Sequence, residues 1–324
     1  MHDADLLARH GWDDERARHV SPGETVARIV RVDRGECDVM TAAGRERVVS
    51  DSARAQSEVA PAVGDWVVLG DPTAGDKRIV ARVLPRGNTL VRRDPSTAVV
   101  DQVLVANVDE VAIVHGLDRP LPPGRLERFL VQVWDSSAQP LVVLSKADLA
   151  HDLDDVEETV RAVAPDVDVL ATGLDGRGID DLRARITPGR TLALVGASGV
   201  GKSTLVNLLV GEEVQETREV RARDAKGRHT TTARELLLVP EGGAVIDTPG
   251  VRAVGLWADE EALHRVFADI EERAELCRFS NCAHDREPGC AVRDVVDPRR
   301  LERYRSLLAE IDELRERSRA RRKR

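Results

Sequence analysis

The sequence predicts a multidomain α/β protein with a small N-terminal β-barrel, a central parallel sheet flanked by helices, and a helical C-terminal segment. Short alternating apolar runs fill about residues 24–93, as is typical of antiparallel strands. From about residue 99, strand-like and helix-like segments alternate, which indicates a doubly wound parallel sheet. Beyond about residue 257 the chain becomes charged and helical in pattern.

Composition limits the classes of protein that this chain can belong to. Its 324 residues are 42% hydrophobic and 32% charged, which is ordinary for a globular chain of two or three domains. No apolar run reaches the roughly eighteen residues of a membrane span, and the acidic first twenty residues do not form a signal peptide. We therefore expect a cytoplasmic protein with no membrane partner.

The net charge of −9 does not indicate a nucleic-acid binder, but the charge is uneven. Residues 315–324 hold seven basic side chains and one acid. Such a block is usually a solvated tail and often an arm for nucleic acid.

Residues 1–22 are expected to form a short polar or helical leader without assigned chemistry. Residues 23–94 are expected to form an RNA-binding OB-fold barrel, because five short strands lie within about seventy residues. Trp66 is the only aromatic residue there, so base stacking cannot carry the binding. The alternative is a barrel that only packs against its neighbour domain. The candidate phosphate contacts are Arg86, Arg92 and Arg93.

The strongest motif follows an apolar run at residues 191–195, where GASGVGKS leads into leucines at helical spacing. A strand, a glycine-rich turn and a helix form the context of a phosphate loop. Lys202 would reach the β- and γ-phosphates, and the Ser203 hydroxyl would ligate Mg²⁺. The alternative is a turn that merely joins strand to helix. The expected nucleotide contacts are Gly196, Ala197, Ser198, Gly199, Val200, Gly201, Lys202, Ser203 and Thr204.

A second motif, DTPG, ends an apolar strand about 45 residues after the phosphate loop. Asp247 at this position can hold the Mg²⁺ shell, and the Gly250 N–H can touch the γ-phosphate. DTPG alone is a common turn sequence, but its distance from a phosphate loop makes the nucleotide role the better interpretation.

Residues 145–148, Ser-Lys-Ala-Asp, end another strand and resemble the guanine-reading NKxD motif. The aspartate of that motif accepts hydrogen bonds from two guanine donors that adenine lacks, so Asp148 would select GTP over ATP. Ser145 replaces the usual asparagine and loses an amide donor, which predicts lower base affinity with specificity retained. The alternative is a polar strand-end turn. The expected guanine contacts are Ser145, Lys146, Ala147, Asp148, Thr172 and Gly173.

A switch segment is expected between the phosphate loop and DTPG, at KGRHTTT (residues 226–232). Thr230 or Thr231 would complete the Mg²⁺ shell. Val251 stands where many GTPases carry a water-orienting glutamine, so we expect slow hydrolysis by the free protein. His229 is the nearest substitute, and a loop-supporting or partner-binding role for it is an equal alternative.

The order of these motifs is informative, because the base-reading segment precedes the phosphate loop. Most GTPases have the reverse order. Residues 95–257 are therefore expected to form a circularly permuted P-loop GTPase domain.

Residues 258–324 contain Cys277, Cys282, His284 and Cys290 within fourteen positions. Four closely spaced nitrogen and sulfur ligands in a cytoplasmic protein indicate one structural, tetrahedral Zn²⁺ site. We expect a helical zinc-binding domain with a basic tail. Cys37 lies in a predicted barrel strand and is expected to be a buried apolar residue.

Together these residues resemble the ribosome small subunit-dependent GTPase A family (RsgA, also called YjeQ). The resemblance covers about residues 24–300, and it includes GDWV, GRLERFL, GASGVGKSTLVN, GRHTTT, IDTPGVRAVGLW and CRFSNCAHDREPGCAV. It implies a factor that acts late in maturation of the 30S ribosomal subunit, with the barrel and the basic tail holding 16S rRNA. A monomer is the default expectation for a factor that docks on so large a particle. The resemblance also implies Mg²⁺ with GTP or GDP as cofactors, hydrolysis stimulated by the 30S subunit, and release of the factor after hydrolysis.

Two other hypotheses remain at this point. One is an RNA-binding module that uses guanine nucleotide as a static structural ligand, which Val251 and Ser145 keep open. The other is a generic ATP-dependent P-loop enzyme, which Asp148 disfavours.

Overall fold

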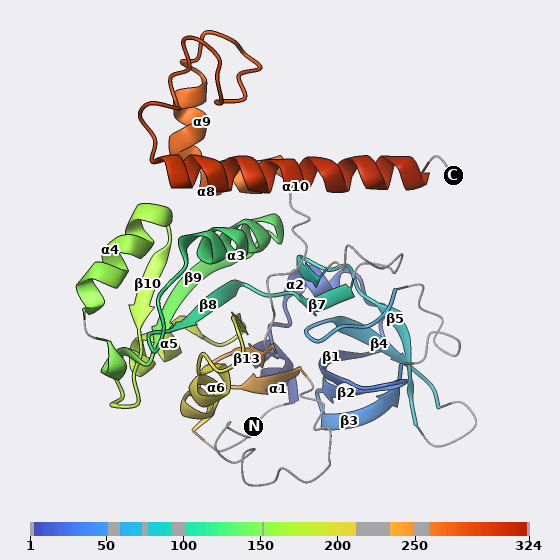
Figure 1. Cartoon of the computed structure of the whole chain (residues 1–324). Coiled ribbons are helices and arrows are strands. Elements are labelled where there is room, and N and C mark those ends of the chain that lie inside the picture. The colour runs from blue at the N-terminus through green and yellow to red at the C-terminus, as the bar shows by residue number, and fades with distance from the viewer. Residues whose placement is uncertain are drawn as a thin grey trace, which may run out of the picture.

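A barrel and a parallel sheet are joined edge to edge in the computed structural model (Figure 1). The structure describes residues 3–50, 59–72, 77–92, 102–150, 152–211, 234–248 and 259–322. Together the two parts form an eleven-stranded sheet, and a long helix lies across the top in the view of Figure 1. None of the helices in these ranges combines the length and the apolar character that a membrane span needs.

The barrel contains five strands, and it closes because the first strand pairs with the fourth. The strand order is β1-β2-β3-β5-β4, with β4 returning to β1, and β3 and β5 are parallel while the other pairs are antiparallel. This OB-like arrangement confirms the predicted fold. The bounds are β1 (Thr25–Val32), β2 (Glu36–Thr41), β3 (Gly44–Val49), β4 (Trp66–Gly70) and β5 (Ile79–Val83).

Alternating side chains along these strands fill the barrel interior. In β2 the side chains of Cys37, Val39 and Thr41 are buried and their neighbours are partly exposed, as the period of two along a strand requires. Cys37 is fully buried, and burial raises the pKa of its thiol to about 12. It is therefore the apolar core residue that its position predicts.

The leader lies against the barrel, in helices α1 (Asp3–Arg9) and α2 (Asp14–Ala17). Leu7 packs with Trp66 of β4 in one small apolar cluster, and the rings of Trp12 and Trp66 lie 4.9 Å apart. Trp66 is 1% exposed. The barrel's single tryptophan therefore serves packing and is closed to a stacking base.

Arg28 of β1 is a buried cation that joins three parts of the chain. Its guanidinium donates hydrogen bonds to the carbonyl oxygens of His10 in the leader, Gly64 in the barrel (3.3 Å) and Asn107 before the parallel sheet (2.9 Å). Burial lowers the pKa of Arg28 to about 9. Because a buried charge without partners is strongly unfavourable, these carbonyl contacts fix the relative positions of leader, barrel and sheet.

Arg86 does not turn outward as a phosphate contact would. It pairs with the buried carboxylate of Asp65 through two bonds of 2.7 Å and donates to Ala60 O at 2.8 Å. The Arg86 guanidinium is therefore engaged by the turn before β4, and this pairing differs from the expected phosphate contact. The side chain of Arg92, and Arg93, lie outside the described residues.

The second part is a six-stranded sheet in the order β10-β9-β8-β11-β13-β12. All neighbours in it are parallel except β12, which runs antiparallel to β13 and also pairs with β1 of the barrel. The chain completes β8, β9 and β10 before β11, as the permuted order predicts. The bounds are β8 (Glu110–Gly116), β9 (Gln139–Ser145), β10 (Asp168–Ala171), β11 (Thr191–Val195), β12 (Glu235–Leu238) and β13 (Ala244–Asp247); a separate pair is formed by β6 (Thr89–Arg92) and β7 (Gln102–Ala106).

Helices cover both faces of this sheet. Buried residues of α3 (Pro123–Asp135) and α4 (Leu153–Val163) belong to one apolar cluster. Those of α5 (Ile179–Arg185) and α6 (Lys202–Val210) belong to another. The four central strands, β8, β9, β11 and β13, are buried along almost their whole length, as expected for a doubly covered parallel sheet.

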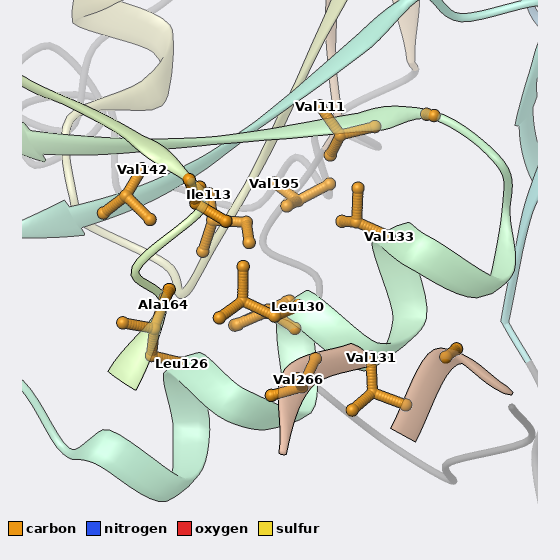
Figure 2. Packing of buried hydrophobic residues seen from close by; sticks show 14 of the residues in the cluster. Val111, Ile113, Leu126, Leu130, Val131, Val133, Val142, Ala164, Val195 and Val266 are labelled. Atoms are coloured by element: carbon orange, nitrogen blue, oxygen red, sulfur yellow. The ribbon is translucent and has the colours of Figure 1, made fainter. Parts of the chain in front are cut away.

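Helix α3 is the layer between the sheet and the C-terminal helices. Figure 2 shows Leu126 and Leu130 turned toward the sheet residues Val142 and Ile113, and Val131 close to Val266 on the other side. The same apolar cluster continues into α8 (Glu260–Val266), α9 (Ala268–Ala274) and α10 (Pro298–Arg322). The C-terminal helices therefore share a continuous core with the sheet.

A buried ion-pair network fastens α10 to α3. The carboxylate of Glu127, which is 0% exposed, accepts bonds from Arg300 at 3.0 Å and from Arg303 at 2.6 and 2.9 Å. Arg300 also pairs with Asp269 of α9 at 2.7 Å. Farther along α10, Arg315 pairs with Asp259 at 2.7 Å. The first arginine of the basic block at residues 315–324 therefore has a carboxylate partner within the protein.

We predict that Glu127→Ala destabilises the protein strongly, because it removes the buried carboxylate that Arg300 and Arg303 share and leaves Arg300 with Asp269 as its carboxylate partner. Loss of one partner of a buried pair costs about 3–5 kcal/mol. Glu310→Ala is the matched control, since Glu310 joins the same two helices through Arg128 at 2.8 Å but is more exposed, and such pairs contribute about 0–1 kcal/mol. Urea unfolding gives the free energy of unfolding of each variant. Equal losses of stability in the Glu127→Ala and Glu310→Ala variants would contradict a special role for the buried network.

Candidate functional site

The candidate site lies at one edge of the parallel sheet, where the carboxyl ends of its strands meet. β9 ends at Ser145, β11 at Val195 and β13 at Asp247. Parallel pairing through β8 aligns Gly116 with Ser145 and Ile113 with Val195. Ligands of open α/β sheets bind at such an edge.

The turn after β11 has the backbone of a phosphate loop. Gly196, Gly199 and Gly201 have φ values of 148°, 80° and 97°, which side chains disfavour. A Cβ at Gly196 would also lie 2.4 Å from the carbonyl oxygen of Val114. Helix α6 begins at Lys202 without a side-chain cap, so the first N–H groups of the helix are open to an anion.

Lys202 lies buried beneath the loop that it would serve. Its ammonium group donates to the carbonyl oxygens of Gly196 and Ala197, both at 3.0 Å. Burial lowers the pKa of Lys202, and the Asp247 carboxylate opposes that shift. The Lys202 ammonium group therefore stabilises the turn conformation of the loop and places a positive charge at its centre.

Ser203 and Asp247 meet as two Mg²⁺ ligands would. The Ser203 hydroxyl lies 3.1 Å from Asp247 Oδ2. Adjacent oxygens on an octahedral Mg²⁺ with bonds of about 2.1 Å are separated by about 3.0 Å. A hydroxyl and a carboxylate at this spacing beside an anion-binding turn fit Mg²⁺ bound together with a phosphate.

Residues 145–148, the expected base-reading segment, are tied directly to the phosphate loop. The buried hydroxyl of Ser145 lies within hydrogen-bond distance of Val200 O in the loop and 3.1 Å from His115 O on β8. Lys146 donates to Gly199 O at 2.8 Å. The serine side chain thus reaches the loop although it is shorter than asparagine. Its hydroxyl has one proton, so it can donate to only one of the two carbonyl oxygens at a time.

The other expected base contacts gather around Asp148. Its exposed carboxylate accepts a weak bond from Leu174 N at 3.3 Å, and Ala147 N donates to Thr172 O at 2.9 Å. A Cβ on Gly173 would lie 3.1 Å from Asp148 Oδ1. The 172–174 turn therefore lies beside the carboxylate, as a loop under a bound base would.

The expected switch residues His229, Thr230, Thr231 and Gly250 lie outside the described residues, as does Val251. Thr248, which the sequence analysis did not select, is described and fully buried. Its hydroxyl bonds Leu194 O on β11. The start of the DTPG segment is thereby fixed to the strand that carries the phosphate loop.

A second site lies in the loops between α9 and α10. The ligand atoms of Cys277, Cys282, His284 and Cys290 all lie within 4.8 Å of one another. His284 Nδ1 is 3.6 Å from Cys277 Sγ and 3.5 Å from Cys290 Sγ. A tetrahedral zinc with ordinary bond lengths separates sulfur and nitrogen by about 3.6 Å, so the four residues fit this ion.

Glu287 organises the same loops and was missed in the sequence. Its carboxylate accepts backbone N–H bonds from Ala283 (3.1 Å), Asp285 (3.0 Å) and Arg286 (3.1 Å). The hydrogen bond from its own backbone N–H, together with those from Ala283 and Asp285, holds the pKa of Glu287 down to about 2. An acid between two metal ligands has no local signature for this role, because a surface charge would look the same.

Comparison with known proteins agrees with this geometry. A model of the RsgA GTPase family matches residues 83–257. The small ribosomal subunit biogenesis GTPase RsgA of Streptomyces avermitilis is 45% identical over 318 residues, covering 94% of this chain and 85% of the relative. The Streptomyces coelicolor protein of the same name is also 45% identical, with 94% and 86% covered.

Two solved structures are similar over most of the chain. YjeQ from Thermotoga maritima superposes with a TM-score of 0.62 at 25% identity, covering 89% of this chain and 98% of YjeQ. YloQ, described as a circularly permuted GTPase, gives a TM-score of 0.61 at 25% identity, with 91% and 97% covered.

We predict that Ser145→Ala weakens nucleotide binding by loosening the tie between β9 and the phosphate loop. One lost hydrogen bond costs about 0.5–1.5 kcal/mol, which raises the Kd for GDP about 2- to 12-fold. Isothermal titration with GDP measures the change. Ser136→Ala is the control, since Ser136 is buried and bonds Val133 O at 2.7 Å at the end of α3. An unchanged Kd in the Ser145 variant would show that the tie does not matter for binding.

Proposed function

This chain belongs to the RsgA GTPase family, and from that premise we propose that it binds the 30S ribosomal subunit and couples GTP hydrolysis to a late step of the subunit's maturation. Hydrolysis would then release the factor. The observation that carries the proposal is the meeting of two segments at one sheet edge. The base-reading segment 145–148 and the phosphate loop 196–201 arrive there in permuted order and contact each other.

The roles of the site residues follow from their positions. Asp148 would accept the two donors of guanine, and the loop N–H groups with Lys202 would surround the β- and γ-phosphates. Ser203 and Asp247 would hold the Mg²⁺ that accompanies GTP or GDP. When bound, Mg²⁺ neutralises charge that develops on the phosphate oxygens.

Hydrolysis requires water to attack the γ-phosphorus while the bond to the β–γ bridging oxygen breaks, giving GDP and inorganic phosphate. Lys202 and the loop N–H groups would stabilise the negative charge that collects on the phosphate oxygens. We further propose that His229 orients the water, that Thr230 or Thr231 completes the Mg²⁺ shell, and that the Gly250 N–H senses the γ-phosphate. Without a glutamine after DTPG, the free protein would turn over slowly.

The path of the chain would link nucleotide state to the C-terminal helices. DTPG follows β13, and the described chain resumes at the start of α8, which packs on α3. A shift of this segment on loss of the γ-phosphate would therefore act directly on α8 and on the helices that share its core.

The partner surfaces are proposed from the domain organisation. A barrel at residues 23–94 and the basic block at residues 315–324 would hold 16S rRNA, the latter through its charge. Residues 95–257 would form the GTPase domain, and residues 258–324 the zinc-binding domain. The protein would act as a cytoplasmic monomer on a much larger particle.

The proposal is tested by measuring phosphate release from GTP at physiological salt, with the free protein, with purified 30S subunits and with 50S subunits as control. We expect slow release by the free protein and strong stimulation by 30S alone. Equal stimulation by 50S would contradict the stated partner. Tight GTP binding without any stimulation would favour the static-ligand alternative.

We also predict that the protein purified under reducing conditions holds about one zinc per chain. Cys290→Ser should lose this zinc, because a tetrahedral structural site needs all four ligands. Cys37→Ser is the matched control, since this thiol lies buried in the barrel. Elemental analysis by mass spectrometry measures the content. Full zinc retention by the Cys290 variant would show that the cluster is not the site.

A further inference from the structure

The loop after β8 places a carboxylate against the base-reading segment. Asp118 Oδ2 lies 2.9 Å from the ammonium nitrogen of Lys146. Arg119 orients the same carboxylate from the other side, with bonds of 3.2 and 3.0 Å to its two oxygens. None of the sequence motifs includes Asp118, which lies 28 positions before Lys146 along the chain.

Lys146 is thereby held between two partners. Its backbone has a φ of 60°, in the left-handed region, and its ammonium group donates to Gly199 O at 2.8 Å while it contacts Asp118. One cation therefore bridges the loop after β8 and the phosphate loop. A long flexible side chain with one partner alone would be free to leave that bridge.

The backbone around Asp118 is fitted to this contact. Leu117 N donates to Ser145 O at 2.9 Å, and the His115 ring lies 3.2 Å from Arg119 O. A Cβ on Gly116 would lie 2.7 Å from Asp118 Oδ1 and 3.4 Å from Val200 Cα. A side chain at this position would displace the Asp118 carboxylate, which therefore lies close against the end of β8.

The charge on Asp118 is maintained in the folded protein. Its bonds with Arg119 and Lys146 hold the pKa of the carboxyl well below its usual range. The side chains of Asp118 and Lys146 are 30% and 28% exposed, so the pair by itself would add little to stability. The Asp118–Lys146 pair differs from other surface pairs because it lies between the base-reading segment and the phosphate loop.

We propose that Asp118 is a positioning residue for guanine nucleotide binding, which fixes Lys146 against Gly199 so that the base-reading segment and the phosphate loop keep their spacing before the nucleotide arrives. This inference rests on the nucleotide site of the proposed function and on no property of the ribosome. Asp118 acts through Lys146, so its effect on binding should require that lysine.

A double-mutant cycle on the Kd for GDP, measured by titration calorimetry, tests this dependence. Asp118→Asn should raise the Kd for GDP and for a non-hydrolysable GTP analogue by the same factor, about 3- to 10-fold. The kcat at saturating GTP should stay unchanged. In a Lys146→Ala background, Asp118→Asn should raise the Kd further by less than about twofold. Asp118→Glu keeps the negative charge, so its Kd should lie between those of the wild-type protein and the Asp118→Asn variant.

Glu24→Gln is the matched control. Glu24 pairs with Arg82 of the barrel at 2.7 Å, and its side chain is also 30% exposed, so its loss should leave the Kd unchanged. An unchanged Kd for Asp118→Asn, or an equal loss in the Lys146→Ala background, would overturn the inference. Failure of 30S stimulation would count against the proposed function and leave this result standing, because the cycle contains no ribosome.

Discussion

The contact of Ser145 and Lys146 with the phosphate loop is the interaction on which the site depends. The two bonds join residues 55 and 53 positions apart in the chain, and they form because β8 pairs with both β9 and β11. Strand β9 ends at the expected base-reading segment, and strand β11 leads into the phosphate loop. A permuted chain can therefore build the site, since only the spatial order of the strands matters and their order of synthesis does not.

The other parts of the molecule are fastened to this sheet by buried charges as well as by apolar packing. Arg28 joins leader and barrel to the segment that enters β8, and Glu127 joins α3 to α10. Such groups specify geometry, because each is unfavourable unless every partner is in place. Helix α3 then lies between the sheet and the C-terminal helices (Figure 2), and Cys277 and Cys290 of the candidate zinc site pack against the same apolar core.

Local patterns predicted most of the fold. Alternation in β2, the glycines around Lys202 and the spacing from Cys277 to Cys290 each act within a short stretch, and the sequence shows them directly. Asp118, Glu127 and Arg28 carry no such signature, because their roles depend on partners brought close by the sheet. Arg86 pairs with Asp65 instead of pointing outward as a phosphate contact. The sequence does not show this pairing, because the fold brings the two residues together. The continuous helical pattern after residue 258 likewise hides the break at Phe267, where the backbone leaves α8 before α9 begins.

If residues 145–149 and 172–176 form one guanine-specific site together with residues 197–204, hydrogen exchange should detect it. Amide exchange in the intact protein would be followed by mass spectrometry with saturating GDP, with ADP at the same concentration, and without nucleotide. We predict that GDP slows exchange both at residues 145–149 with 172–176 and at residues 197–204, and that ADP slows neither group. Protection confined to residues 197–204, or equal protection by ADP, would contradict a single site that reads guanine and phosphate together.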